Sequence, residues 1–189
     1  MPEIQLRTPL VAVADLPYQG HDIEIRELPG QGYMNLRGDA SQRAFTEAVQ
    51  GVCGVALPGA ANTVSGPHPP CALWLGPDEW LLRLPGEADA VVAVAGLESA
   101  LDGHFYAAND VSSAQTALRM AGPRVREVLS KGCTLDLHPR AFGTGRCAQT
   151  NLAKTVAILM PVDDARGIDV IVRRSFADYL ARWLLDACR

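Results

Sequence analysis

The sequence predicts an α+β fold in which single helices pack on mostly antiparallel sheets. Apolar segments with the alternation of strands come in pairs, and a segment with helical spacing follows each pair. The same order of strand, strand and helix occurs in both halves of the chain, so we expect two similar lobes. The strict alternation of strand and helix that a doubly wound parallel fold requires is absent from this pattern.

The chain length suits two small lobes, because 48% of its 189 residues are hydrophobic and can form a core. We expect an N-terminal arm over residues 1–20, a first lobe over 21–104 and a second lobe over 105–189. Pro2, Pro9 and Pro17 interrupt any regular element in the arm. An arm of this kind is either disordered or held by a partner.

The first lobe opens with two predicted strands, over residues 23–28 and 33–37, because their apolar residues alternate with polar ones. Asp39 is expected to cap the first helix, with Gln42 three residues later in the capping-box position. The inner face of this helix is predicted from residues at helical spacing, which are Phe45, Val49 and Val52.

The rest of the first lobe is predicted as a loop, a hairpin and a helix. Glycine, proline, serine and asparagine crowd the loop over residues 58–70. Residues 71–84 form two apolar runs around Gly76-Pro77-Asp78-Glu79. Pro77 fixes the backbone φ angle of one turn residue, and Gly76 allows a wider range of backbone angles at another, so this segment predicts a hairpin. The alanine- and valine-rich residues 88–101 predict a well-buried helix.

The second lobe begins with strands predicted over residues 105–111 and 115–120, around a turn at Ser112-Ser113. Gly122-Pro123 is expected to open a helix with proline in its first position. The inner face of this helix is predicted to contain Val125, Val128 and Leu129.

Three further strands are predicted over residues 146–152, 155–160 and 168–172. Ser175 is expected to cap the last helix, with Asp178 three residues later. The apolar stripe of this helix is predicted to consist of Phe176, Tyr179, Leu180, Trp183 and Leu184.

Charge and composition exclude several classes of protein. The net charge is −4, whereas a nucleic-acid-binding protein usually carries a basic balance or stripe. No apolar run approaches the ~20 residues of a membrane span. The five cysteines are odd in number and widely spaced, and residues 1–10 lack the pattern of a signal peptide. We therefore expect free thiols and a cytoplasmic protein.

No segment predicts a self-contained catalytic or cofactor site. Gly30-Gln31-Gly32 and Gly143-Thr144-Gly145 are isolated pairs of glycines that indicate turns, not a dinucleotide or phosphate loop. Cys133, His138 and Cys147 lack the close spacing of a zinc site. His68 precedes Cys71 by three residues, but Cys71 begins an apolar strand, which favours a structural thiol. We assign no catalytic residue and no metal ligand.

Four arginines form the candidate interface. Arg140 and Arg146 flank a predicted loop, and Arg173 and Arg174 precede the last helix. Guanidinium groups suit carboxylates of a partner protein or of a polyanionic ligand. The same residues are equally compatible with an ordinary solvated surface.

Several longer segments resemble the gamma subunit of the heterotetrameric bacterial sarcosine oxidases. The resemblance runs from about Arg37 to the C-terminus. The segments that carry it are Leu36-Arg37-Gly38-Asp39, Leu73-Trp74-Leu75-Gly76-Pro77-Asp78-Glu79-Trp80-Leu81-Leu82, Leu135-Asp136-Leu137-His138-Pro139-Arg140-Ala141-Phe142, Arg146-Cys147-Ala148-Gln149-Thr150 and Arg173-Arg174-Ser175-Phe176-Ala177-Asp178-Tyr179.

This resemblance implies a non-catalytic gamma subunit with a structural or assembly role. The complex it implies oxidises sarcosine to glycine, hydrogen peroxide and either formaldehyde or, with tetrahydrofolate, methylene-tetrahydrofolate. It implies alpha, beta and delta subunits as partners. FAD, FMN, NAD, tetrahydrofolate and zinc are then expected in those subunits and not in this chain.

A more distant similarity connects the chain with the folate-binding aminomethyltransferases of glycine cleavage. It rests on Asp110-Val111-Ser112, on Gly122 with a short helix, and on Leu135-Asp136. The transferases carry Asn-Asp in place of Leu135-Asp136 and Ser-His-Met-Gly in place of Ser112-Ser113-Ala114-Gln115. The similarity implies a fold of this type. It leaves open an alternative function as a folate-binding module or aminomethyltransferase-like enzyme, with a pocket near Asp110 and Asp136.

Overall fold

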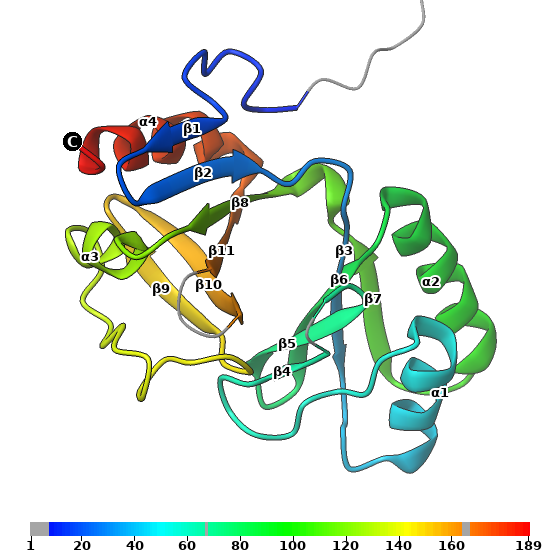
Figure 1. The fold of residues 1–189 in the computed structure, drawn as a ribbon. Helices are drawn as coiled ribbons and strands as arrows, with labels where there is room; N and C mark the ends of the chain where they lie inside the picture. The colour runs from blue at the N-terminus through cyan, green and yellow to red at the C-terminus, as the bar shows by residue number, and fades with distance from the viewer. Residues whose placement is uncertain (1–7, 67, 164–166) are drawn as a thin grey trace, which may run out of the picture.

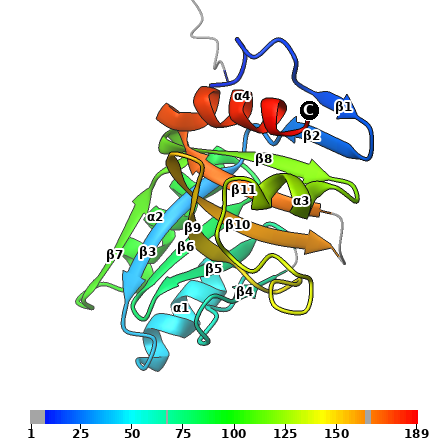
Figure 2. The ribbon, with the colours of Figure 1, turned by 90° about the vertical axis from the view of Figure 1, so that its left-hand side faces the viewer.

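Two antiparallel sheets that face each other form the centre of the molecule (Figure 1, Figure 2). The computed structural model describes residues 8–66, 68–163 and 167–189. Helices α1 (Arg43–Cys53) and α2 (Glu87–Ala100) cover the outer face of one sheet. Helices α3 (Val125–Ser130) and α4 (Ala177–Ala187) cover the other. The predicted α+β class with mostly antiparallel sheets is therefore confirmed.

The first sheet has five strands in the order β4-β5-β6-β3-β7. Alternation along its interior strand β3 points Met34 and Leu36 to the helices and Tyr33 to the opposite sheet. The bounds of its strands are β3 (Gly32–Gly38), β4 (Val64–Ser65), β5 (Cys71–Gly76), β6 (Glu79–Leu84) and β7 (Tyr106–Asp110). The hairpin predicted over residues 71–84 is confirmed as β5 and β6.

The second sheet has six strands in the order β1-β2-β8-β11-β10-β9. Leu118 and Met120 of β8 face α3 and α4, whereas Ala117 faces the first sheet. The bounds of its strands are β1 (Tyr18–Gly20), β2 (Ile23–Glu27), β8 (Gln115–Ala121), β9 (Ala148–Leu152), β10 (Thr155–Asp163) and β11 (Gly167–Arg173).

A third apolar layer fills the space between the sheets. Its buried members are Tyr33, Cys71, Leu73, Leu81, Ala117, Cys147, Ile158, Met160 and Ile171. The central strands are thus buried on both faces, one against helices and one against the opposite sheet. This explains why β5, β6 and β10 have nearly continuous apolar sequences and not a clean alternation.

Two strands pair across the boundary that the sequence predicts between the lobes. β2, expected in the first lobe, pairs with β8, where Ile25 lies opposite Met120. β7, expected in the second lobe, pairs with β3, where Leu36 lies opposite Ala108. Periodicity indicates which face of a strand is buried but not which strand lies beside it. The division between residues 104 and 105 stays a prediction. The sheet of the first range contains β7 from the second range, and the sheet of the second range contains β2 from the first.

The described part of the expected N-terminal arm packs onto the second sheet. Leu10 and Val13 are only 3% and 4% exposed and belong to the core beneath α3 and α4. β1 adds a strand beside β2. The prolines exclude a long element, as expected, but they permit turns that bury these apolar side chains. Residues 1–7 of the predicted arm lie outside the described residues.

Two predicted helix caps are wrong. α1 begins at Arg43, with Gln42 as the residue before it, and the Asp39 carboxylate instead accepts bonds from the Ser41 backbone and side chain. A short 3₁₀ turn over Arg174–Phe176 precedes α4, so Ser175 does not cap that helix. The Asp39 side chain stabilises a local turn in place of the helix terminus, which is why a polar residue before a helix does not determine where the helix begins.

The buried faces of three helices also differ from expectation. Val52 of α1 is half-buried, and Cys53 lies in the core in its place. α2 exposes Val91 and Val92, so it is not well buried all round. α4 buries a face one position away from the predicted stripe, and its buried residues are Ala177, Leu180, Ala181, Leu184 and Leu185. Small alanines let α4 pack closely on the sheet and leave the bulkier Phe176 and Tyr179 exposed.

The helix predicted after Gly122 is confirmed, although it begins at Val125 and Pro123 lies before its first turn. Its buried residues are Val125, Val128 and Leu129, as expected. Within the described residues, none of the helices combines the length and the apolar character that crossing a bilayer requires.

Candidate functional site

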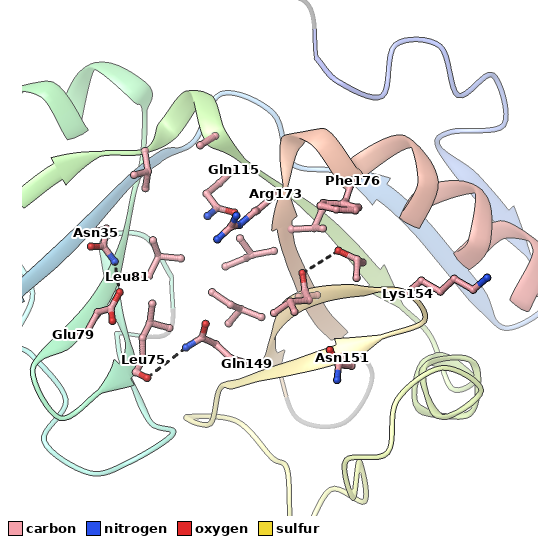
Figure 3. A pocket seen from close by; sticks show the side chains of 18 residues that line it. Asn35, Leu75, Glu79, Leu81, Gln115, Gln149, Asn151, Lys154, Arg173 and Phe176 are labelled. Atoms are coloured by element: carbon pink, nitrogen blue, oxygen red, sulfur yellow. Dashed lines mark hydrogen bonds between the residues drawn. The ribbon is translucent and has the colours of Figure 1, made fainter.

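A groove of about 790 Å³ opens between the two sheets (Figure 3). Its apolar wall includes Leu81 of β6 and Ile158 and Ile171 of the opposite sheet. Polar and charged side chains surround this wall, and they are Asn35, Glu79, Gln115, Gln149, Asn151, Lys154 and Arg173. A groove of this size suits a ligand or an inserted peptide segment.

Two hydrogen bonds organise one side of the groove. The Asn35 side-chain amide donates a hydrogen bond to Glu79 Oε1 at 2.8 Å. Glu79 is the single carboxylate among the lining residues, so one of its two oxygens already has a hydrogen-bond donor. The Gln149 amide donates to the Leu75 carbonyl at 3.4 Å and so connects β9 with β5 across the sheets (Figure 3). The groove therefore presents side-chain amides on strands of both sheets.

Arg173 and Lys154 supply the positive charges of the groove. Arg173 ends β11 and extends beside Gln115 into the groove, whereas Lys154 lies at its far end (Figure 3). Both side chains are exposed, and neither forms an ion pair with any residue that the structure describes. With Glu79 as the one lining carboxylate, the groove carries a net positive charge.

The turn between β9 and β10 fixes the position of Lys154. Leu152 lies opposite Thr155, so Ala153 and Lys154 form a two-residue turn, with Ala153 at a φ of 54°. This is a left-handed conformation that alanine rarely adopts. The Ala153 N–H donates to the Gly132 carbonyl at 2.8 Å, and the Lys154 N–H donates to Tyr179 Oη at 3.2 Å. These two bonds to neighbouring elements hold the strained turn.

A buried ion network joins the two sheets beside the groove. Asp169 of β11 is 0% exposed, and both of its oxygens accept bonds from Arg119 of β8, at 2.6 and 2.9 Å. Arg83 of β6, only 1% exposed, donates to Asp169 Oδ2 at 2.5 Å. Two guanidinium groups thus share one carboxylate across the interface between the sheets.

Gln31 and Tyr33 complete this network. Gln31 Oε1 accepts from Arg83 Nε at 2.6 Å and from the Tyr33 hydroxyl at 3.1 Å. Burial raises the pKa of Tyr33, so its phenol stays protonated. Asp169 is fully engaged by hydrogen bonds. The network therefore has the features of a structural clamp and not those of an acid–base pair.

The cysteines and the nearest histidines do not form a nucleophilic or metal-binding group. Cys71 is buried at the start of β5, whereas His68 is exposed. Cys133 contacts Thr150 Oγ1 at 3.6 Å, and Cys147 donates to the backbone carbonyls of Thr63 and Trp74. Over residues 8–66, 68–163 and 167–189, no group of three or more potential ligands is arranged to hold a metal ion.

Burial controls the acidity of the thiols and gives a testable pH dependence. It raises the pKa of Cys53, Cys71 and Cys147 from an ordinary 9.0 to about 11. Between these values the unfolded chain has lost thiol protons that the folded chain keeps, so the free energy of unfolding falls as the pH rises. Below about pH 8 these groups leave stability unchanged.

We expect the urea midpoint of the chain to be lower at about pH 10.5 than at about pH 8, and Ellman's reagent to react slowly with the native thiols at the lower pH. A variant with Cys53, Cys71 and Cys147 all replaced by alanine should lose part of this pH dependence. Native thiols that react as fast as those of the unfolded chain would contradict the assignment.

The structure distributes the four candidate arginines over different surfaces. Arg173 lines the groove, whereas Arg174 lines a smaller pocket of about 400 Å³ together with Glu27 and Glu87. Arg140 and Arg146 are exposed on the segment between α3 and β9 and line neither cavity. Lys154 was not among the candidates, although its place between two predicted strands was a signal that it would lie at a turn.

Asp110 and Asp136 each stabilise a local turn. Asp110 Oδ1 accepts from the Ser112 backbone at 2.9 Å and from its hydroxyl at 2.5 Å. Asp136 Oδ1 accepts from the His138 backbone at 2.9 Å. Neither aspartate lines the groove or the smaller pocket.

Comparison with known proteins gives a consistent family assignment. The model of the "Sarcosine oxidase, gamma subunit family" matches residues 37–189. The chain is 31% identical over 185 residues to the sarcosine oxidase subunit gamma of Corynebacterium sp. (strain P-1), covering 96% of this chain and 89% of that protein. It is 33% identical over 189 residues to the subunit of the same name from Arthrobacter sp., with the same coverage of 96% and 89%.

Solved structures give the same result for the fold. A chain of the heterotetrameric sarcosine oxidase from Corynebacterium sp. U-96, in complex with pyrrole 2-carboxylate, superposes with a TM-score of 0.86 at 29% identity. The superposition covers 97% of this chain and 94% of that chain. The glycine cleavage system aminomethyltransferase T from Bartonella henselae gives a TM-score of 0.62 at 13% identity, over 87% of this chain and 45% of that protein. This second likeness concerns the fold alone.

Proposed function

Because this chain belongs to the sarcosine oxidase gamma subunit family, we propose that it is a non-catalytic subunit of a heterotetrameric sarcosine oxidase. The observation that carries the proposal is the likeness to a chain of such a heterotetramer over nearly the full length of both chains. In this role the chain stabilises the assembled complex and does not form or break substrate bonds.

The complex that we propose contains alpha, beta and delta subunits beside this one. It oxidises sarcosine with molecular oxygen to glycine, hydrogen peroxide and formaldehyde, or to methylene-tetrahydrofolate when tetrahydrofolate is present. FAD, FMN, NAD, tetrahydrofolate and zinc belong to the other subunits in this proposal. The five unpaired cysteines support a reducing, cytoplasmic location.

The chemistry of the buried groups supports a structural role. Asp169 is bound by two arginines, and the thiols of Cys53, Cys71 and Cys147 stay protonated at neutral pH. A general base or nucleophile needs a free lone pair in contact with substrate. Asp110 and Asp136, which the folate-binding alternative requires, are each engaged in a local turn.

Co-expression with the other subunits tests the proposal. We expect the tagged chain to recover the partner subunits together with sarcosine-dependent formation of hydrogen peroxide, and the chain alone to give no peroxide. The isolated chain should also self-associate, since the apolar side chains of Phe105, Val91 and Val92 are exposed. Failure to recover any partner would refute a subunit role, and turnover of sarcosine by the chain alone would refute a non-catalytic one.

A further inference from the structure

We propose that the groove between the sheets receives an extended acidic segment of a partner subunit, whose carboxylates pair with Lys154 and Arg173. The inference rests on the proposed function, because the partner is a subunit of the same complex. It adds the surface of this chain that is used and the chemistry that the surface recognises.

Charge is the first argument. Many arginines of the chain already have carboxylate partners, and these are Arg37, Arg43, Arg83, Arg119, Arg124, Arg182 and Arg189. Lys154 and Arg173 have no such partner among the described residues, yet they line one groove. Its single lining carboxylate, Glu79, already accepts a bond from Asn35. Two cations that line one groove, Arg173 inside it and Lys154 at its end, favour an occupant that carries carboxylates.

The second argument is that the backbone that carries the two cations is held in place. Lys154 belongs to the strained turn that Gly132 and Tyr179 anchor. Arg173 is the last residue of β11 and pairs with Gln115 of β8. The backbone beneath each charge is thus ordered before a partner binds, which reduces the entropy lost on binding. Strained backbone conformations tend to persist where a surrounding structure and a function require them.

The third argument concerns the apolar and amide groups that accompany the charges. Val156 and Phe176 line the groove and are 57% and 43% exposed, so an occupant would bury them. The amides of Gln149, Asn151 and Gln115 can donate to and accept from the backbone of an extended chain. β9, which carries two of these amides, is the last strand of its sheet. This mixture of groups suits an extended peptide segment with acidic side chains.

Carbodiimide coupling tests the inference directly, because it joins a lysine amine to a carboxylate that is in contact with it. The chain contains only two lysines, Lys131 and Lys154. Lys131 Nζ donates to the Ala187 carbonyl of α4, in the helical layer outside the second sheet, and serves as the internal control. In the assembled oxidase, mass spectrometry should find Lys154 joined to an aspartate or glutamate of a partner subunit.

The variant Lys154→Arg should lose this cross-link and Lys131→Arg should retain it. Acetylation of Lys154 by an N-hydroxysuccinimide ester should also be slower in the assembled oxidase than in the isolated chain. Coupling of Lys154 only to carboxylates of its own chain, or equal acetylation in both states, would overturn the proposal.

Charge reversal separates this inference from the proposed function. The double variant Lys154→Glu with Arg173→Glu should bind the other subunits at least about tenfold more weakly than the wild type. The double variant Arg140→Glu with Arg146→Glu makes the same change of charge outside the groove and should bind as the wild type does. Thermal unfolding of both variants verifies that they fold.

The outcomes are distinguishable. If the wild-type chain recovers no partner, the proposed function fails. If the wild type and the Lys154, Arg173 variant recover partners equally well, the subunit role stands and the groove proposal fails. A loss of binding by the Arg140, Arg146 variant as large as that of the groove variant would also refute the groove, since general charge would then explain both effects.

Discussion

Replacing Asp169 with asparagine is expected to destabilise the folded chain by about 3–5 kcal/mol. The carboxylate is completely buried between Arg83 and Arg119, and Arg83 has almost no exposed surface. The amide of asparagine keeps the volume of the side chain but removes the negative charge. A buried guanidinium would then lack its counter-charge and could not reach water without separating the sheets.

Urea-induced unfolding of the dilute chain, followed by tryptophan fluorescence, measures this effect. Asp178→Asn is the matched control, because Asp178 pairs with Arg182 on the exposed surface of α4 at 2.9 Å. Loss of such an exposed pair costs less than about 1 kcal/mol. If Asp169→Asn lowered the midpoint no more than the control, the buried network would not hold the sheets together.

The second large effect is expected at Gly122, where alanine should destabilise the chain by roughly 2–4 kcal/mol. Gly122 has a φ of 119°, a conformation open to glycine and strained for other residues. A Cβ atom there would lie 2.4 Å from the Asp22 carbonyl oxygen. That same oxygen accepts a hydrogen bond from the Arg124 N–H at 3.2 Å, so it cannot move away without loss.

Gly145→Ala provides the comparison for Gly122→Ala. Gly145 also has a positive φ, of 76°, but a Cβ atom there meets nothing within 4 Å. The backbone strain alone should cost about 1 kcal/mol. The difference between the two losses of stability, measured by thermal unfolding, gives the contribution of the close contact between a Cβ atom at position 122 and the Asp22 carbonyl. Equal losses of stability would show that the contact with Asp22 contributes nothing.

Much of the secondary structure could be predicted because it depends on local chemistry. Pro77 and Gly76 specify the turn of the β5–β6 hairpin, and alternation in residues 23–28 specifies β2. The pairing of β2 with β8 could not be predicted, because Ile23 and Ile25 would bury equally well against either sheet. The position beside β8 that β2 occupies depends on how all the strands are arranged, and the sequence of β2 does not specify it.

The candidate site was predictable only in part, for the same reason. The place of Arg173 before the last helix makes it a candidate interface residue, which stays a prediction, and the structure places it along the groove. Asp169 was missed because a polar residue between Ile168 and Val170 normally indicates an exposed strand position. Its partner Arg83 lies 86 residues earlier in the sequence. Such a distant pairing leaves no local pattern, and neither does the position of Lys154 and Arg173 along one groove.

The exchange of β2 and β7 between the sheets imposes an order on folding during synthesis. β2 leaves the ribosome early, but one of its edges stays unpaired until β8, which begins at Gln115, has been synthesised. β8 in turn pairs with β11, which ends only at Arg173. Because such long-range pairing is slow, the nascent chain exposes open strand edges until translation is almost complete. A chaperone or an already folded neighbour would protect it during that interval.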